Sequence, residues 1–378
     1  MATPSFQKVA LAAASGITTC AAGAELSQMF EDTSGCPNFV SSFEGGTRYN
    51  LDTFQGRFKS LFYAYNPLLL LKSSEYCLEG AKELKALKDR HAKGEDVMAG
   101  ITPEENLRLW KLKQEVNSAV HPDTGEIVPH PFRMSGYVPF NGPICVFQVT
   151  SSTTLPIVFW NWANQSQNAL VNYFNRNAAS AMSDETLMKS YTGAVVGAMT
   201  VAMGLATFVK KSFSPPAAAR LLQFVTFPAC VVASSMNCYI VRAPEMDVGV
   251  PILDEKGNDI LPGKLSKVAA TKGVYETTAS RAFLQIPVYF VPPLITSFVP
   301  PIKAIITRTP ALGVPITTYL LLVAFGIGLP GACAVFPKIS SVGTEELEDE
   351  FKEEVERRGG AKIVFGGEGD KAWFDRGL

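Results

Sequence analysis

Acidic residues are missing from three long tracts of this chain. Neither aspartate nor glutamate occurs in residues 127–183, 186–244 or 277–344. Charged residues make up 18% of the 378 positions, whereas about 25% is usual in a soluble protein. Because 47% of the chain is hydrophobic, tracts of this length without acids indicate segments that lie within a membrane.

The chain also lacks the patterns of metal, disulfide and nucleic-acid sites. Its seven cysteines form no CxxC pair and have no histidine at metal-ligand spacing, and scattered thiols of this kind are usually buried small side chains. The net charge is −1, and no basic stripe with interleaved aromatic residues occurs. We therefore expect no metal site, no cofactor and no nucleic-acid partner.

Patterns of catalytic residues are missing as well. His121 and Asp123 suggest a catalytic pair, but the chain has no GxSxG motif or similar nucleophile to accompany them. His121, Pro122, Asp123 and Thr124 are followed by a glycine, and this order is typical of a tight turn. We favour a structural or gating role for these four residues and predict that the protein is not an enzyme.

Five apolar runs are long enough to cross a membrane, since each has the roughly 20 residues that span a hydrocarbon layer of about 30 Å. The expected spans are residues 137–160, 191–209, 217–241, 282–302 and 314–336. The pattern predicts an all-α polytopic membrane protein with about five transmembrane helices and an N-terminal helical soluble region. A soluble all-α protein with a large core is the rival interpretation.

The two ends of the chain hold most of its charge and are expected to face water. We interpret residues 1–50 as a flexible leader, residues 51–136 as a soluble helical region with the HPDT loop, residues 137–337 as the transmembrane region and residues 338–378 as a charged tail. In the soluble region, one helix is expected to begin at Leu68. A second is expected from Pro103 to about Ala119, because Thr102 is a good cap and Glu105 follows it by three residues.

The most unusual stretch is NWANQSQNALVNYFNR, residues 161–176, which follows the first apolar run. On a helix, the spacing of its amides places five of them on one face: Asn161, Gln165, Asn168, Asn172 and Asn175. A buried amide without a partner costs roughly 1–3 kcal/mol. Water, other helices or a polar substrate must therefore pair with this face.

Several motifs resemble those of the sideroflexins, a family of mitochondrial inner-membrane carriers. The resemblance is carried by HPDTGE (residues 121–126), RMSGYVPFN, the amide stretch, LDTFQGRFKSLFYAYNP (residues 51–67), RAPEMDVGVPILDEKGN and the final WFDRGL. These motifs occur in the family's order and cover residues 51–378. The resemblance implies a multi-pass carrier of amino acids, with serine as the expected cargo and a role in one-carbon metabolism.

A zwitterionic cargo gives the amide face a chemical purpose. Uncharged amides supply both donors and acceptors without the ~2.5–3.5 kcal/mol insertion penalty of a charged residue at the membrane centre. The candidate substrate ligands on this stretch are Asn164, Gln165, Ser166, Asn168 and Asn172. The same amides could instead hold helices together through interhelical hydrogen bonds worth roughly 0.6–2 kcal/mol each. The sequence leaves both interpretations open.

Two arginines and one further asparagine complete the candidate substrate site. Arg133, Arg176, Arg242 and Arg281 lie at the ends of spans, where most arginines act as interfacial anchors, but Arg176 or Arg281 could hold a carboxylate. Asn237 and Cys238 precede a departure from the family pattern. The family usually continues with an Asn-Ile-Pro element there, which this chain lacks, and the difference could alter the cargo.

The acid-free spans also bear on coupling. Proton and sodium coupling commonly rely on carboxylates within the membrane, so facilitated exchange or uniport is expected. The expected partners are a small neutral amino acid and membrane lipid. The alternative function is a membrane scaffold that assembles respiratory-chain complexes and needs no substrate site.

Overall fold

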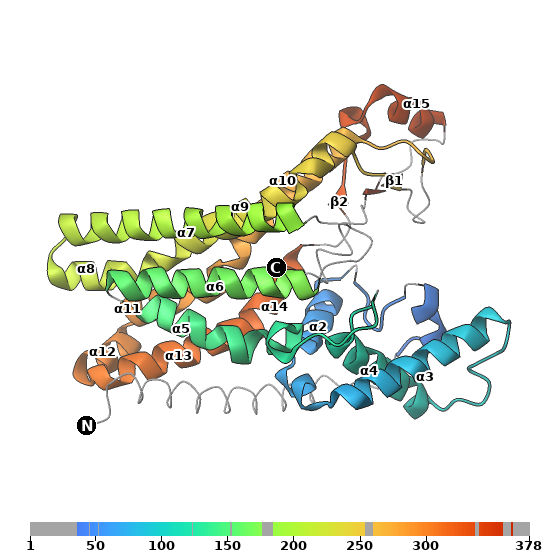
Figure 1. The fold of residues 1–378 in the computed structure, drawn as a ribbon, viewed down its shortest axis with the longest axis horizontal. Coiled ribbons are helices and arrows are strands. Elements are labelled where there is room, and N and C mark those ends of the chain that lie inside the picture. The colour runs from blue at the N-terminus through green and yellow to red at the C-terminus, as the bar shows by residue number, and fades with distance from the viewer. Residues whose placement is uncertain are drawn as a thin grey trace. The chain divides into compact units, whose positions relative to one another are not determined.

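The computed structural model describes residues 36–44, 46–51, 53–122, 124–151, 153–175, 184–253, 260–336, 340–357 and 364–365. The chain divides into two units, each made of two stretches of sequence. The first comprises Met1–Val146 and Phe298–Val335, and the second comprises Phe147–Ser297 and Phe336–Leu378. Both units consist mainly of helices (Figure 1), which confirms the all-α class.

The described helices follow one another in chain order. The first unit contains η1 (Phe39–Glu44), α2 (Phe54–Ala64), η2 (Pro67–Leu71), α3 (Ser74–Ala92), α4 (Pro103–Ala119), η3 (His130–Phe132), η4 (Met134–Gly136), η5 (Tyr137–Asn141), α12 (Pro300–Arg308), η8 (Pro310–Leu312), α13 (Gly313–Val323), η9 (Ala324–Gly328) and α14 (Leu329–Val335). The second contains α6 (Thr154–Phe174), α7 (Asp184–Ser212), α8 (Pro215–Leu221), η6 (Leu222–Phe224), α9 (Thr226–Val248), α10 (Lys267–Leu284), η7 (Ile286–Phe290), η10 (Thr344–Glu346) and α15 (Asp349–Arg357). The boundary between the units falls within α5 (Gly142–Thr150) and α11 (Val291–Phe298).

Strands are few and short in the described part of the chain. Two-residue strands β1 (Ile252–Leu253), β2 (Ser340–Ser341) and β3 (Val364–Phe365) pair antiparallel in the order β1-β3-β2. The second unit holds all three. This small sheet brings the segment after α9 together with two segments of the C-terminal tail.

The N-terminal soluble region is built on the antiparallel pair α3 and α4. As predicted, α4 runs from Pro103 to Ala119, and the side chain of Thr102 accepts a hydrogen bond from the N–H of Glu105. The helix expected from Leu68 is instead the short 3₁₀ turn η2, and α3 begins only after the cap Ser73. The two helices approach closely because Gly80 has no side chain: a Cβ there would lie 2.7 Å from Leu112 Cδ1.

The boundary that we placed at residue 50 is not that of the folded region. Residues 1–35 lie outside the described part, but the 3₁₀ helix η1 packs against α4. Phe39 is only 1% exposed, and its ring lies edge-on to that of Trp110 at 5.3 Å. The N–H of Phe39 also donates to Asn106 Oδ1 at 2.9 Å. These residues therefore belong to the soluble region.

An arginine from α2 holds the end of the last apolar helix of the first unit. Arg57 Nε donates to the carbonyl of Ala334 at 2.8 Å, and its Nη1 donates to the carbonyl of Leu51 at 2.9 Å. The last carbonyls of a helix have no intrahelical partner, and a cation there is favoured by the helix dipole. Arg57 thus joins α2 to the C-terminal end of α14.

Three described helical segments are long and apolar enough to cross a membrane: Met188–Ser212, Pro215–Val248 and Pro310–Val335. A fourth candidate joins Lys267–Phe298 and Pro300–Arg308, which are broken at Val299 and pass the criterion only together. The chain is thus a polytopic membrane protein by the length and composition of its helices. The number of spans is three or four among the described residues, so our figure of about five is approximate.

The predicted first span, residues 137–160, differs most from the structure. It is not one helix, because α5 ends at Thr150 and α6 begins at Thr154. The two helices fold against each other near this break, where the rings of Phe147 and Trp160 stack at 4.7 Å. The amide stretch therefore lies within α6 and does not follow a completed span.

In the second unit, α7 and α9 run side by side (Figure 1) and meet through small residues. A Cβ at Gly197 would lie 2.7 Å from Met236 Sδ, and one at Gly193 would lie 2.8 Å from Ile240 Cδ1. Ala198 and Ala233 are fully buried in the same contact. Small residues let membrane helices approach closely and gain packing contacts. α9 itself is continuous from Thr226 through Cys238 to Val248.

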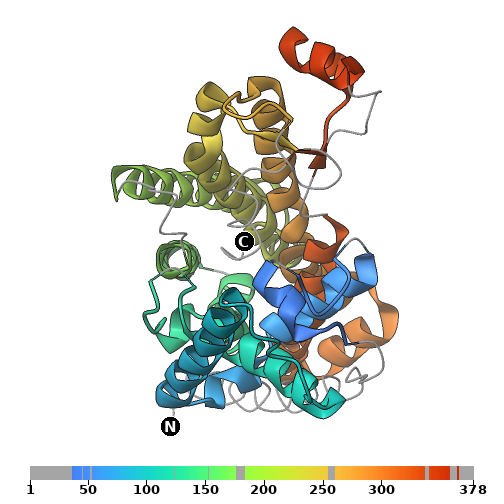
Figure 2. The same ribbon diagram turned by 90° about the vertical axis from the view of Figure 1, so that its right-hand side faces the viewer.

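The charged tail docks on the ends of α9 and α10 (Figure 2). Leu347 and Phe351 are buried against Ile252 and Ala269. Glu348 accepts hydrogen bonds from Ser266 Oγ at 2.7 Å and from the first N–H groups of α10 at 2.8 and 3.1 Å. The tail thus caps α10 with a carboxylate, which the positive end of the helix dipole favours.

Replacing Glu348 by glutamine is expected to weaken tail docking by about 1 kcal/mol, which is typical for a lost cap. Burial raises the pKa of Glu348, but the hydrogen bonds from Ser266 and α10 outweigh it, so the pKa lies below its ordinary value. This stabilisation is complete above the unfolded pKa of about 4.3 and is lost as the pH falls through the lower folded pKa.

Hydrogen exchange at the N–H groups of Lys267 and Val268 measures this docking. The protection of these amides relative to the unfolded chain should be lower in the Glu348→Gln variant at pH 7, and in the wild type it should fall as the pH drops below the unfolded pKa of about 4.3. Glu350→Gln is the matched control, because Glu350 forms only an exposed ion pair with Lys264. Equal protection in wild type and Glu348→Gln would show that the carboxylate does not hold the tail.

Candidate functional site

The amide face of α6 divides into two parts with different surroundings. Asn161 and Asn164, nearest the start of the helix, are 1% and 2% exposed. Gln148 of α5 donates from Nε2 to Asn161 Oδ1 at 2.8 Å, and Asn161 Nδ2 donates to the carbonyl of Ile157 at 2.7 Å. These amides are paired with the protein itself, so this part of the face holds α5 and α6 together.

Cys230 and Tyr289 extend the buried network to α9 and η7. The Tyr289 hydroxyl donates to Asn164 Oδ1 at 3.3 Å, and the sulfur of Cys230 accepts from Gln148 Nε2 at 3.3 Å and from Asn164 Nδ2 at 3.8 Å. Thr226 Oγ1 donates to the backbone carbonyl of Gln148 at 3.3 Å. Asn164, a candidate substrate ligand, therefore belongs to a helix junction.

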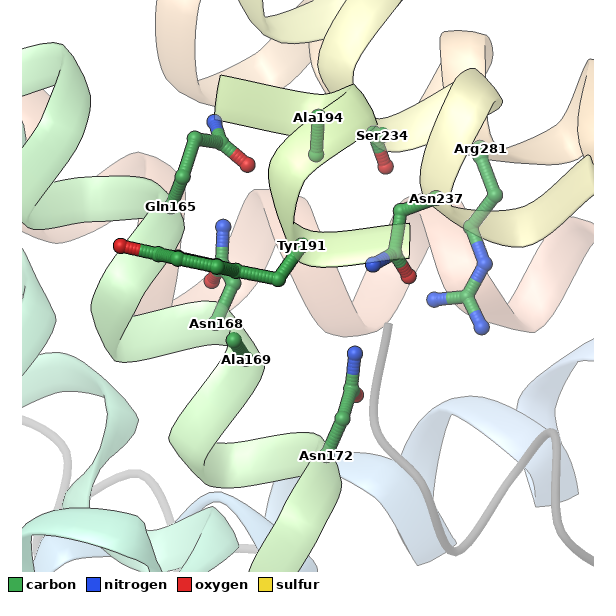
Figure 3. Close-up of a pocket in the computed structure, with 9 residues that line it drawn as sticks. All are labelled: Gln165, Asn168, Ala169, Asn172, Tyr191, Ala194, Ser234, Asn237 and Arg281. Atoms are coloured by element: carbon green, nitrogen blue, oxygen red, sulfur yellow. The ribbon is translucent and has the colours of Figure 1, made fainter. Parts of the chain in front are cut away.

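The second part of the amide face opens onto a pocket between four helices of the second unit (Figure 3). Helix α6 contributes Gln165, Asn168, Ala169 and Asn172, α7 contributes Tyr191 and Ala194, α9 contributes Ser234 and Asn237, and α10 contributes Arg281. The pocket has about 350 Å³ of empty space, counting the part that opens to solvent, but the centre of a water molecule can occupy only about 20 Å³ of it. That is room for about one water molecule.

Charge in the pocket has a single sign among the described lining residues. Arg281 is its one cation, and no carboxylate lines it. In Figure 3, Arg281 lies beside Asn237, the amide of Asn172 points toward Asn237, and the amide of Asn168 lies by the ring of Tyr191. Amides and hydroxyls can both donate and accept hydrogen bonds. The arrangement can bind one carboxylate at Arg281 and place neutral donors and acceptors around the remainder of a small polar molecule.

Ser166, another candidate, does not line the pocket but contacts a residue that does. Its hydroxyl lies 2.9 Å from the Tyr191 hydroxyl and donates to the carbonyl of Trp162 at 3.0 Å. Tyr191 crosses from α7 toward α6 (Figure 3). Ser166 therefore positions the tyrosine ring at one side of the pocket.

The structure brings together five of the eight predicted substrate residues: Gln165, Asn168, Asn172, Asn237 and Arg281. Arg176 lies outside the described residues, as does Asp123. Sequence reasoning missed Tyr191 and Ser234, which lie at the start of one apolar run and within another, each beside further hydroxyl residues. Their positions on α7 and α9 could have been suspected only from the polarity of single residues.

The HPDT segment forms the tight turn that its sequence predicts. The His121 N–H donates to the carbonyl of Glu126 at 2.8 Å, and the Gly125 N–H donates to the carbonyl of His121 at 2.9 Å. Gly125 has a φ of 70°, and the Thr124 N–H donates to His121 Nδ1 at 3.3 Å. His121, Pro122 and Thr124 are not among the residues that line the pocket. Their gating role stays a prediction.

The described residues contain no cluster of three or more His, Cys, Asp or Glu side chains that could hold a metal ion. The polar groups that line the pocket are amides, hydroxyls and a guanidinium group.

Comparisons with known proteins show similarity along most of the chain. The family model of the sideroflexins matches residues 45–378. Sideroflexin-5 of Homo sapiens is 35% identical over 317 residues, which cover 83% of this chain and 90% of that protein. Sideroflexin-3 of Homo sapiens is 34% identical over 320 residues (84% and 94%), and Sideroflexin-1 of Mus musculus is 35% identical over 311 residues (82% and 91%). No solved structure matches the chain significantly.

Proposed function

The chain belongs to the sideroflexin family, and we propose that it is a mitochondrial inner-membrane carrier of serine or related small neutral amino acids. The observation that supports this best is the pocket of four amides, a tyrosine, a serine and one arginine between α6, α7, α9 and α10.

The chemistry of the pocket suits each group of a zwitterion. A carboxylate pairs with the guanidinium of Arg281 through charge-assisted hydrogen bonds, which are about twice as strong as neutral ones. An ammonium group is received by amide oxygens and by the face of Tyr191, because a cation is attracted to an aromatic ring. The hydroxyl of serine finds further partners in Asn168 or Asn172.

The lack of acids among the described lining residues supports facilitated exchange or uniport. A proton or sodium ion carried with the substrate would commonly need a carboxylate at the site, and none of the described residues that line the pocket is acidic. The room in the pocket, about one water molecule, is too small for an amino acid. We infer that the helices move apart to admit the substrate and that transport follows an alternating-access cycle.

The alanines of the pocket are expected to limit the size of the cargo. Ala169 is half-buried and lines the pocket beside Asn168 and Asn172. Replacing Ala169 by leucine adds three carbons to this wall. We expect uptake of serine to fall at least tenfold while uptake of glycine falls much less, because a missing or added methylene in a pocket changes discrimination by about 10-fold or more.

Competition between serine and glycine in proteoliposomes measures this change. The control is Leu170→Ala, which alters an exposed position next to Ala169. Ala206→Leu would be unsuitable because Ala206 is buried. An equal loss of serine and glycine uptake in Ala169→Leu would mean that this wall does not set the size limit.

Uptake of labelled serine by the purified protein in liposomes tests the proposed function. We expect saturable uptake that small neutral amino acids inhibit and that glutamate or lysine inhibits much less, since the pocket has one cation and no acid among its described residues. A scaffold for respiratory-chain assembly would give no uptake above that of empty liposomes. That result would refute the proposed function.

A further inference from the structure

A partly buried ion pair on α9 lies near the pocket and bonds to α10. Arg242 of α9 is 9% exposed. Its Nη2 lies 2.8 Å from Glu245 Oε2, and its Nε donates to both oxygens of that carboxylate at 3.1 and 3.2 Å. Its Nη1 donates to Thr277 Oγ1 of α10 at 2.7 Å. The pair thus joins α9 to α10.

Helix geometry places this ion pair beyond the pocket, toward the end of α9 and the start of α10. Arg242 follows the pocket residue Asn237 by five residues, and Thr277 precedes the pocket residue Arg281 by four. Four to five residues of helix correspond to about 6–8 Å along the axis. The direction is toward the end of α9 and the start of α10, where the C-terminal tail docks.

A hydroxyl without a partner lies along the same stretch of α10. The Oγ1 atom of Thr278 is buried and makes no hydrogen bond within the described part of the protein. Thr278 precedes Arg281 by three residues, and positions three or four apart share one face of a helix. Polar side chains therefore continue from Arg281 to the ion pair.

We propose that Arg242 and Glu245 form an outer binding station for the two charged groups of a zwitterionic amino acid on its way to the pocket. The carboxylate of the amino acid pairs with Arg242, and its ammonium group pairs with Glu245. One ion pair of the protein is thereby exchanged for two with the substrate. The carboxylate then passes to Arg281, about one helical turn away. This inference rests on the proposed transport of amino acids.

The surroundings of the two side chains fit this exchange. The side chain of Arg242 is 10% exposed, whereas that of Glu245 is 31% exposed, so the carboxylate is open to an approaching group. Arg242 also keeps the Thr277 hydroxyl as a partner when Glu245 turns away. A pair that only anchored α9 at the membrane surface would need no such second partner on α10.

The station is expected to select for molecules that carry both charges. A molecule with one charge separates Arg242 from Glu245 but satisfies only one of them, and an unpaired, partly buried charge is unfavourable. Glycerate, which has a hydroxyl in place of the ammonium group of serine, would leave Glu245 without a partner. Wild-type protein should therefore take up glycerate far more slowly than serine.

An anion that pairs with Arg242 leaves the negative charge of Glu245 unpaired. Glu245→Gln removes that charge and therefore tests the station. In proteoliposomes, the ratio of glycerate uptake to serine uptake should rise on the order of tenfold in this variant. Glu185→Gln is the matched control, since Glu185 forms an exposed ion pair with Lys189 on α7. An unchanged ratio in a folded Glu245→Gln variant would overturn the proposal.

A second variant keeps the proposal testable if Glu245→Gln does not fold. Glu245→Asp retains the charge but shortens its reach by one methylene, so the KM for serine should rise several-fold while kcat changes little and glycerate stays excluded. A lower kcat with an unchanged KM would contradict the station and indicate a purely structural pair. If wild-type protein takes up no serine at all, the proposed function fails; if it does and the ratios do not move, only the station fails.

Discussion

Replacing Arg281 by glutamine is expected to reduce serine uptake on the order of 100-fold. Arg281 is 8% exposed and is the one cation among the described residues that line the pocket. Truncating one partner of a buried charge pair typically costs about 2–5 kcal/mol, and each 1.4 kcal/mol is about a factor of ten. Glutamine keeps hydrogen-bond donors but cannot balance the charge of a carboxylate.

The uptake assay for Arg281→Gln needs a control for the loss of a cation. Arg220→Gln provides it, because Arg220 lies on α8, is exposed and does not line the pocket. Arg281→Lys should restore part of the activity, since lysine keeps the charge without the planar fork of donors. Full uptake in the folded Arg281→Gln protein would remove this arginine from the substrate site.

Alanine substitutions at Asn161 and Asn172 are expected to affect different properties, although both remove an asparagine from the same helix. Asn161→Ala should lower stability, whereas Asn172→Ala should weaken serine binding. Asn161→Ala deletes a hydrogen-bond partner of Gln148, and the amide of Gln148 stays in the buried junction without that partner. We expect the free energy of unfolding to fall by about 1–2 kcal/mol, within the range for interhelical hydrogen bonds and unsatisfied buried groups. The side chain of Asn172 lines the pocket. Asn172→Ala should therefore change the free energy of unfolding by less than about 0.5 kcal/mol.

Thermal unfolding in detergent and serine uptake in proteoliposomes, measured on both variants, separate these effects. Asn161→Ala should lower Tm. Asn172→Ala should keep Tm and raise the KM for serine. If Asn172→Ala lowered Tm as much as Asn161→Ala and left uptake unchanged, the division of the amide face into a junction and a binding part would be wrong.

Features that depend on a few neighbouring residues could be predicted from the sequence. The start of α4 is set by local capping at Thr102, Pro103 and Glu105, and the sequence predicts this start. The predicted end of the helix, at about Ala119, also agrees with the structure. The turn at His121 to Gly125 was likewise predicted, because proline, threonine and glycine determine it locally. The family motifs identified the overall class before any tertiary contact was known.

The division of the amide face required tertiary structure. Periodicity places Asn161 and Asn172 on the same side of α6 and cannot show that one meets Gln148 while the other meets open space. Tyr191 was missed because a tyrosine at the start of an apolar run is also typical of a residue at the membrane interface. The first span is shorter than predicted because the run of hydroxyl residues at 150–154, which a membrane span can tolerate, here separates α5 from α6.

The most direct test of the account is serine uptake by purified protein carrying both Asn168→Ala and Asn172→Ala, compared with wild type in the same liposomes. The central claim is that the second part of the α6 amide face, which includes Asn168 and Asn172, lines a transport site for a small zwitterion. We predict saturable uptake in the wild type and its loss in the double variant at an unchanged Tm. Unchanged uptake in the folded double variant would contradict that claim.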